Sequence, residues 1–385
     1  MSYQTLYRRY RPQIFEDMIG QEHITRTLKN QIRTGAIGHA YLFSGARGIG
    51  KTSAAKIFAR AVNCTESTDG SPCLKCANCI NYPNIDILEI DAASNNRVEE
   101  IRELRDKVKY PPVNGKFKVY IIDEVHMLSD SAFNALLKTL EEPPDNVVFI
   151  LATTEVQKLP ATILSRCMRF DFRLPGTDEI KELLAKIFAE IKADCEPSAL
   201  SLIARLSEGG VRDALSIADM CLSFATGRLT YTDVLEVTGG GGEEVAKLTE
   251  AIVTGDSPTA LKIAAELGAM GKNIAVLCKD VAARSRMLGI AKITTDGNKI
   301  LQLPDDKYSE IATLATQVSA DKITAAVDIF VRLENDFRYG LNPQLIFENA
   351  ALKACLLPAD LDAARLQVRV SDLEKRLKEL EVRLR

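Results

Sequence analysis

The chain has 385 residues, of which 46% are hydrophobic and 26% are charged, and its formal net charge is −3. This length and composition predict two or three well-packed domains, and the sequence contains no apolar stretch near the roughly 20 residues of a membrane span. The near-neutral charge gives no indication of nucleic-acid binding by the whole chain, so any such role depends on local basic surfaces. The first residues lack the apolar core of a signal peptide, and we expect a cytoplasmic protein.

Aromatic and basic residues alternate near the start of the chain, in the run Tyr7-Arg8-Arg9-Tyr10-Arg11-Pro12. Such interleaving is typical of segments that stack on the bases of single-stranded nucleic acid while neutralising its phosphates. From composition alone, this run is therefore a candidate nucleic-acid arm.

A glycine-rich loop follows the apolar residues 40–43 and leads into a helix-prone segment, residues 53–62. The loop consists of Gly45, Ala46, Arg47, Gly48, Ile49, Gly50, Lys51 and Thr52. In a strand, loop and helix arrangement of this kind, backbone N–H groups point at phosphate oxygens, Lys51 reaches the β- and γ-phosphates and the Thr52 hydroxyl ligates Mg²⁺. The pattern predicts that the chain binds a nucleoside triphosphate.

Four of the nine cysteines lie close together in the pattern C-x8-C-x2-C-x2-C, at Cys64, Cys73, Cys76 and Cys79. Four thiolates at this spacing can surround one ion in a closed tetrahedral site, which is typical of structural zinc. An iron–sulfur cluster and disulfides are the alternatives, and a reducing cytoplasm disfavours disulfides. We expect residues 64–79 to form a zinc module that stabilises a surface insertion.

A buried-strand pattern at residues 118–123 ends in the acidic pair Asp123 and Glu124. Beside a phosphate loop, Asp123 is expected to hold Mg²⁺, and Glu124 is expected to polarise the attacking water as a general base. The pair therefore predicts hydrolysis of the bound nucleotide.

Four apolar runs have the length and character of parallel strands, at residues 40–44, 85–91, 118–123 and 147–153. Helical patterns at residues 101–108 and 131–142 separate the later strands, and Pro143 and Pro144 end the second helix. The first domain, residues 1–173, is therefore predicted to be a doubly wound α/β fold of the P-loop NTPase class. In such a sheet, ligands lie at the carboxyl ends of the strands, where Gly45, Asp123 and Thr153 fall.

Beyond this domain the sequence predicts helices. Residues 177–191, 198–207 and 211–225 indicate a small helical domain, residues 174–238, and four consecutive glycines at 239–242 indicate a linker. A further helical block occupies residues 243–358. Leucines and a valine spaced by three and four residues at 361–385 predict an amphipathic helix that forms a coiled coil, binds a partner or packs on its own chain.

Taken in order, these motifs resemble those of AAA+ clamp-loader ATPases, specifically the γ/τ family of bacterial DNA polymerase III, over nearly the whole chain. The motifs are Tyr10-Arg11-Pro12 with Phe15, Ile19-Gly20-Gln21, the loop at 45–52, the four cysteines, Asp123-Glu124-Val125-His126-Met127-Leu128, the segment 137–144, Leu151-Ala152-Thr153-Thr154 and Leu164-Ser165-Arg166-Cys167. The resemblance implies an AAA+ domain, a helical lid and an all-α collar through which subunits assemble. It also implies ATP as the nucleotide, with Mg²⁺.

The resemblance further implies a function and a set of partners. Proteins of this family are ATPase motors that open a ring-shaped sliding clamp and place it on primed DNA. The expected partners are the δ and δ′ subunits and further copies of the chain in a hetero-pentamer, together with the clamp and the DNA. Polymerase and helicase are expected as partners only through a longer form of the chain, which here stops at Arg385.

Several residues acquire expected roles only through this resemblance. Arg166 is expected to reach the ATP site of the neighbouring subunit as an arginine finger, although a lone arginine here would otherwise be read as a surface ion pair. Thr154, with Thr153, corresponds to the residue that senses the γ-phosphate, and turn capping is the alternative. Arg212 corresponds to the arginine that couples ATP to the lid, where a helix-surface charge is the alternative. Arg11 and Pro12 are expected to cover the adenine.

DNA contacts are expected on the inner face of the assembly, from helix ends and scattered cations. The candidates are Arg97, Lys138, Lys158 and Thr162, each of which is equally compatible with a solvent-facing position. Two other functions remain open at this point. One is an AAA+ remodeller that threads protein or branched DNA, for which the expected aromatic pore loop is not found between Asp91 and Asp123. The other is a zinc-bearing scaffold subunit that retains nucleotide without hydrolysing it, against which the intact Lys51, Thr52, Asp123 and Glu124 argue.

Overall fold

A computed structural model describes residues 4–67, 69–82, 85–94, 103–104, 106–238, 242–294, 296–301, 303, 305–337 and 342–356. The chain divides into two compact units, Met1–Leu229 and Thr230–Arg385. Among the helices that the structure describes, none combines the length and the apolar character needed to cross a bilayer. Part of the helix predicted at 101–108, and the amphipathic helix predicted at 361–385, lie outside the described residues.

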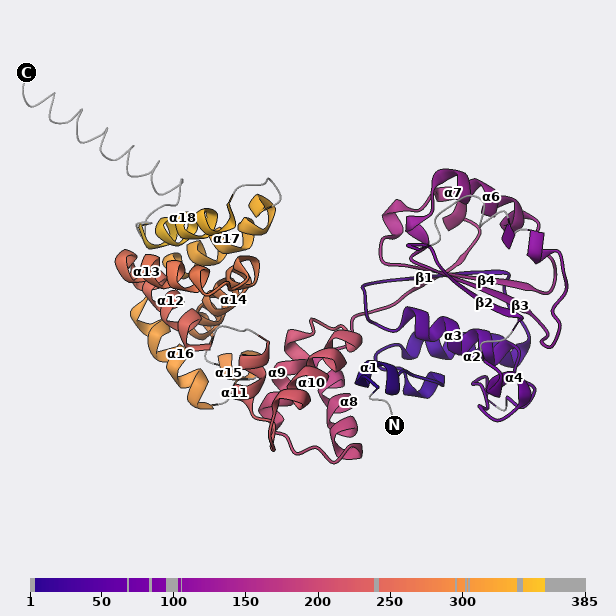
Figure 1. Ribbon diagram of the computed structural model, residues 1–385, viewed down its shortest axis with the longest axis horizontal. Coiled ribbons are helices and arrows are strands. Elements are labelled where there is room, and N and C mark those ends of the chain that lie inside the picture. The colour runs from indigo at the N-terminus through magenta and orange to yellow at the C-terminus, as the bar shows by residue number, and fades with distance from the viewer. Residues whose placement is uncertain are drawn as a thin grey trace, which may run out of the picture. The chain divides into compact units, whose positions relative to one another are not determined.

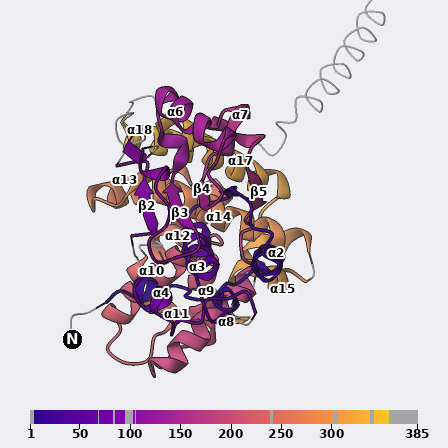
Figure 2. The ribbon, with the colours of Figure 1, turned by 90° about the vertical axis from the view of Figure 1, so that its right-hand side faces the viewer.

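The first unit is built on a parallel five-stranded sheet with the strand order β2-β3-β4-β1-β5. The edge strands β2 and β5 lie on opposite sides of β3 and β4 (Figure 2). The strands are β1 (Ala40–Ser44), β2 (Ile87–Asp91), β3 (Lys118–Asp123), β4 (Val147–Thr153) and β5 (Met168–Asp171). The predicted bounds of β1, β3 and β4 are confirmed, while β2 begins two residues later than predicted. β5 was not predicted.

Helices cover both faces of this sheet (Figure 1). Alternate residues of each central strand face opposite layers: Tyr41 and Phe43 of β1 join the core beneath α2 (Glu22–Thr34) and α3 (Lys51–Val62). Leu42 joins the core beneath α6 (Asp130–Glu141) and α7 (Ala161–Leu164). Every residue of β1 and β4 is buried, as expected for strands with both faces covered. The doubly wound α/β prediction is therefore confirmed.

Short elements connect these layers. They are α1 (Leu6–Arg9), the 3₁₀ helices η1 (Phe15–Asp17), η2 (Val125–Met127) and η3 (Val156–Lys158), and α4 (Ala77–Ile80). The first unit ends in three helices, α8 (Thr177–Glu190), α9 (Pro197–Leu206) and α10 (Val211–Phe224). Each of these three lies within one residue of its predicted bounds. Pro197 begins α9. Proline suits the first helical turn because the N–H that it lacks would have no acceptor within the helix.

The second unit is helical in the part that the structure describes. Its helices are α11 (Tyr231–Val237), α12 (Gly242–Thr254), α13 (Ser257–Ala269), α14 (Ile274–Ile293), α15 (Gly297–Leu301), α16 (Asp305–Gln317), α17 (Ala320–Asp336) and α18 (Pro343–Leu356). Gly242, which was predicted to belong to the linker, instead begins α12. Phe330 of α17 and Phe347 of α18 meet edge to face, with ring centroids 5.9 Å apart, in the core of this unit.

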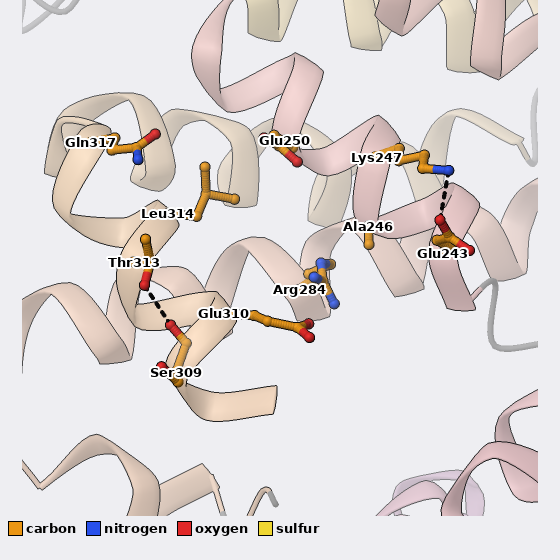
Figure 3. Close-up of a pocket in the computed structure, with 10 residues that line it drawn as sticks. All are labelled: Glu243, Ala246, Lys247, Glu250, Arg284, Ser309, Glu310, Thr313, Leu314 and Gln317. Atoms are coloured by element: carbon orange, nitrogen blue, oxygen red, sulfur yellow. Dashed lines mark hydrogen bonds and ion pairs between the residues drawn. The ribbon is translucent and has the colours of Figure 1, made fainter. Parts of the chain in front are cut away.

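A pocket of about 660 Å³ lies among α12, α14 and α16 (Figure 3). Its lining mixes both signs of charge, since Glu243, Glu250 and Glu310 surround Lys247 and the half-buried Arg284. Lys247 is already paired with Glu243 at 2.7 Å. The lining thus favours neither an anionic nor a cationic ligand.

Candidate nucleotide site and cysteine cluster

The glycine-rich loop connects β1 to α3 through backbone conformations that favour glycine. Gly45, Gly48 and Gly50 have φ of 144°, 77° and 101°. A Cβ on Gly45 would lie only 2.7 Å from the carbonyl oxygen of Phe172, so the loop is also held close to the end of the sheet. No side chain caps α3 at Gly50, and the first-turn N–H groups of this helix remain available to an anion. The loop therefore fits a phosphate chain.

Lys51, the first residue of α3, reaches back to the start of this loop and is only 6% exposed. Its ammonium donates hydrogen bonds to the carbonyl oxygens of Gly45 at 2.7 Å and Ala46 at 2.6 Å. Burial lowers the pKa of Lys51, and the nearby charges of Glu124 and Asp123 only partly oppose this effect. An anion bound in the loop would stabilise the buried ammonium.

The sheet brings Thr52 and Asp123 together from positions 71 residues apart. The Thr52 hydroxyl donates a hydrogen bond to Asp123 Oδ2 at 2.7 Å, and the backbone N–H of Glu124 donates to Asp123 Oδ1 at 3.0 Å. Hydroxyl and carboxylate oxygens are the ligands that Mg²⁺ prefers, so this donor set fits the ion. Parallel strands β1 and β3 end at the same edge of the sheet, which explains why the two groups meet.

Glu124 follows Asp123 with a left-handed backbone, φ 48°, which aims its carboxylate at the end of β4. Glu124 Oε2 accepts hydrogen bonds from the N–H of Thr154 at 3.3 Å and from its hydroxyl at 3.1 Å. His126, which the sequence analysis named only as part of a motif and without a role, has Nδ1 3.0 Å from Thr153 Oγ1 and 3.4 Å from Glu124 Oε2. Its Nε2 lies 3.3 Å from Glu155 Oε1. The sequence signal for His126 was its place two residues after Glu124, in a 3₁₀ turn that returns towards the strand end.

Arg212 and the N-terminal run lie beside the same loop. The backbone N–H of Arg212, at the start of α10, donates to the carbonyl oxygen of Gly48 at 3.2 Å. Its guanidinium carbon lies 5.0 Å from the centroid of the Tyr7 ring. Arg11 Nε donates to Ser53 Oγ at 3.1 Å. The run at residues 7–12 thus packs against α3, which follows the phosphate loop, and against Arg212 of α10, which favours the nucleotide interpretation over a free nucleic-acid arm.

Arg166 is engaged elsewhere in its own unit. Its guanidinium donates to Glu141 Oε1 and to the carbonyl oxygen of Thr162, each at 2.8 Å, and to Ser165 Oγ at 3.2 Å. These partners belong to α6 and to α7 with its C-cap, and none belongs to the phosphate loop. The structure therefore does not bring Arg166 together with Lys51 and Asp123.

The candidate DNA-contact residues share no common environment in the part of the chain that the structure describes. Lys138 is exposed in the last turn of α6, and Lys158 is paired with Glu155 at 2.9 Å. Thr162 offers its carbonyl oxygen to Arg166. Arg97 lies outside the described residues.

The four predicted cysteines form one compact cluster, in which all Sγ atoms lie within 4.8 Å of one another. The Sγ atoms of Cys64 and Cys76, and those of Cys73 and Cys79, are 3.9 Å apart. A tetrahedron with Zn–S bonds of about 2.3 Å has edges of about 3.8 Å, so one zinc ion fits between them. The separations are too long for disulfides, and all four thiols are free.

Backbone N–H groups support the thiolates. Cys73 Sγ accepts from the N–H of Cys76 at 3.2 Å and of Lys75 at 3.4 Å, while Cys64 Sγ accepts from the N–H of Cys73 at 3.4 Å. Burial raises the pKa of the Cys64 and Cys79 thiols. A dication among them favours the thiolates and reverses this effect.

Three family models match consecutive parts of the chain. Residues 20–175 match "DNA polymerase III, delta subunit", residues 179–227 match "DNA polymerase III clamp loader subunit, ATPase lid domain", and residues 230–366 match "DNA polymerase III subunits gamma and tau domain III".

Relatives with known names match as well. DNA polymerase III subunit tau of Bacillus subtilis (strain 168) is 43% identical over 391 residues, covering 99% of this chain and 69% of the relative. Subunit tau of Escherichia coli (strain K12) is 46% identical over 275 residues, covering 70% of this chain and 43% of the relative. Among solved structures, the RuvB Holliday junction branch migration motor of Thermotoga maritima is 20% identical with a TM-score of 0.47, covering 67% of this chain and 85% of that one.

Proposed function

Since the chain belongs to the family of DNA polymerase III γ and τ clamp-loader subunits, we propose that it is the ATPase motor that drives opening of the sliding clamp and its loading onto primed DNA. The observation that carries the proposal is the hydrogen bond between Thr52 and Asp123, 2.7 Å long, at the mouth of the glycine-rich loop. This hydrogen bond places the two oxygen ligands expected for Mg²⁺ side by side, next to the loop expected to hold the phosphates.

In this proposal different residues of the chain bind the phosphates, hold Mg²⁺ and activate the attacking water. The loop N–H groups and Lys51 bind the phosphates, and Thr52 and Asp123 hold Mg²⁺, which neutralises charge on the phosphate oxygens when bound. Glu124 orients and deprotonates the attacking water. In this structure Oε2 of that carboxylate accepts two hydrogen bonds from Thr154, which restrain its position. In this proposal Thr154 restrains Glu124, and the binding of a γ-phosphate beside Thr154 releases the carboxylate to act on water.

Arg166 completes the neighbouring subunit's site in this proposal, so hydrolysis requires assembly. A guanidinium placed against a γ-phosphate neutralises charge that develops in the transition state. Its hydrogen bonds to Glu141 and Thr162 hold it on the surface of its own unit until a neighbour docks. Arg212, bound through its backbone to Gly48, links the nucleotide loop to the lid helices.

The proposed assembly contains δ and δ′ subunits and further copies of this chain, joined through the helical collar at residues 243–358. Residues 174–238 are proposed as the lid, and the four cysteines are proposed to hold structural zinc. Lys138, Lys158, Thr162 and Arg97 are proposed to face DNA phosphates. We place the complex in the cytoplasm, and contacts with polymerase and helicase belong to a longer form of the chain.

The test is transfer of a labelled sliding clamp onto primed circular DNA by the assembled loader. The wild-type loader should place the clamp only when ATP and Mg²⁺ are present. Lys51→Ala should abolish loading, whereas Lys186→Ala, an exposed lysine of α8, should load normally. ATP-independent loading, or full loading by Lys51→Ala, would refute the proposal.

A further inference from the structure

Residues 11–18 lie between the phosphate-loop helix and the cysteine module, residues 64–79. On one side, Arg11 Nε donates a hydrogen bond to Ser53 Oγ, and Ser53 is the residue after the proposed magnesium ligand Thr52. On the same side, a Cβ on Gly50 of the phosphate loop would lie 3.3 Å from Met18 Cε. A nucleotide whose phosphates occupy the loop must extend its nucleoside along the surface beside it. Residues 11–18, together with Tyr7 at Arg212, border that surface.

Arg60 connects this segment to Tyr82, which follows the cysteine module in the chain. It lies on α3, is 8% exposed and donates from Nη1 to Gln13 Oε1 at 3.0 Å. Gln13 in turn donates to the carbonyl oxygen of Arg11 at 3.0 Å. On its other side, the Arg60 guanidinium carbon lies 4.3 Å from the centroid of the Tyr82 ring. The guanidinium therefore bridges Tyr82 and Gln13.

Tyr82 comes three residues after the last cysteine and is firmly placed. Its hydroxyl donates to Glu89 Oε1 at 2.7 Å, and Glu89 also accepts from Lys56 of α3. Asn78, within the module, donates to the carbonyl oxygen of Asn63 at the end of α3 at 2.8 Å. Tyr82 therefore takes its place from β2, α3 and the core beside them, and the chain reaches it directly from the last cysteine of the module. The module itself lies beside α3 and α2 (Figure 1).

A second connection reaches the segment through Glu16. Ser71, between the first two cysteines, donates to Glu16 Oε2 at 2.7 Å, and Lys29 donates to Glu16 Oε1 at 2.5 Å. Gly70, φ 82°, packs on the backbone of Lys29, where a Cβ would lie 2.6 Å from the carbonyl oxygen. The module therefore contacts the segment directly at Glu16, and it connects to Gln13 only indirectly, through Tyr82 and Arg60.

We infer that the metal-bound cysteine module sets the position of residues 11–18 and thereby the affinity of the site for the nucleoside part of its ligand, with Arg60 as the positioning residue. Short loop-rich segments of this kind depend on their metal for a defined fold. Without the metal, Ser71 loses its fixed place and the module no longer holds the chain that leads from Cys79 into Tyr82, whereas the loop at 45–52 keeps its own contacts with phosphates. The inference depends on the proposed nucleotide site.

Calorimetric titration of the full chain with Mg-ATP and, separately, with magnesium tripolyphosphate tests this inference. Protein with zinc bound is compared with protein stripped of zinc, after the chelator is removed and Mg²⁺ restored, and folding is checked by circular dichroism. Zinc removal should raise the Kd for ATP about tenfold, as expected for loss of one or two hydrogen bonds, and change the Kd for tripolyphosphate less than about twofold.

Arg60→Met, which keeps the cysteines, covers the case in which stripped protein unfolds. It should show a selective loss of ATP affinity with zinc bound, and zinc removal should then add only the smaller loss that follows from the Ser71–Glu16 contact. Arg26→Met, an exposed arginine of α2, is the matched control and should bind both ligands normally. An unchanged Kd for ATP in Arg60→Met, or equal losses for ATP and tripolyphosphate, would overturn the inference. Failure of zinc-bound wild type to bind either ligand would instead refute the proposed nucleotide site, and the inference with it.

Discussion

Arg166 Nη2 donates a hydrogen bond to Glu141 Oε1 at 2.8 Å, across the 25 residues that separate the two positions. The pair joins the residue proposed to act in a neighbouring ATP site to the end of α6 in its own chain. Both side chains are partly exposed, at 33% and 48%, so the pair is easily broken. The guanidinium can therefore exchange this carboxylate for a phosphate at little cost.

Glu141→Gln tests whether this ion pair restrains Arg166. An exposed pair of this kind contributes about 0–1 kcal/mol, so the variant should raise the ATP hydrolysis rate of the assembled loader by no more than about fivefold. Steady-state phosphate release measures the effect. A rate that falls as far as in Arg166→Ala would mean that Glu141 positions the arginine instead of restraining it.

Glu124→Gln should separate nucleotide binding from hydrolysis. The amide cannot act as a base, so phosphate release in the assembled loader should fall by about a hundredfold or more, while the Kd for ATP changes less than about threefold. Glu155→Gln is the matched control, because Glu155 also lies beside His126 but is proposed to have no part in catalysis. Comparable losses in the two variants would remove Glu124 from the role of base.

Asp86, which is 1% exposed, anchors the loop before β3 by accepting backbone hydrogen bonds from Val113 at 2.7 Å, Asn114 at 2.6 Å and Gly115 at 2.8 Å. Burial acts to raise the pKa of Asp86, but these N–H groups prevail and hold it below the ordinary value of 3.8. The carboxylate therefore stabilises the fold above that value, and the stabilisation is lost as pH falls through the lowered pKa.

Asp86→Asn replaces one acceptor oxygen with an NH₂ group that faces N–H donors. It should destabilise the first unit by about 2–3 kcal/mol at pH 7, measured by hydrogen exchange of the β3 amides. The difference from wild type should shrink as pH falls below the ordinary aspartate pKa. A difference independent of pH would show that the charge of Asp86 is not what stabilises the loop.

Cys76→Ser should release zinc and lower the melting temperature by several degrees, because three thiolates cannot close the tetrahedral site. Metal content and calorimetric melting measure both effects. Cys195→Ser, a half-buried cysteine outside the cluster, should keep about one zinc per chain. Full zinc content in the Cys76 variant would exclude this thiol as a ligand.

The sequence predicted the central strands well because β1, β3 and β4 are covered on both faces and are therefore continuous apolar runs. The edge strand β5 was missed because Met168-Arg169-Phe170-Asp171 is mostly exposed and carries no such run. One-turn elements such as α1 and α4 were missed because four residues are too few for a helical period to be recognised.

The site residues likewise fall into those that a local sequence pattern predicts and those that only the fold brings together. The phosphate loop and the cysteine spacing are local patterns, so the sequence alone contained them. The contacts of Glu124 with Thr154 and of Arg212 with Tyr7 join distant segments and depend on the packed sheet and helices. Nothing in the local sequence distinguishes Arg60 from other helix-surface arginines. Its burial between Gln13 and Tyr82 emerges only from the fold.

The most direct test of the central claim is steady-state ATP hydrolysis by the assembled loader, with and without sliding clamp and primed DNA, for wild type, Arg166→Ala and the control Arg169→Ala. Clamp and primed DNA should stimulate wild type and the control, while Arg166→Ala should bind ATP normally but hydrolyse it about a thousandfold more slowly. A wild-type rate unaffected by clamp and primed DNA, or full activity of Arg166→Ala, would contradict the account of a clamp-loader motor with a finger from the neighbouring subunit.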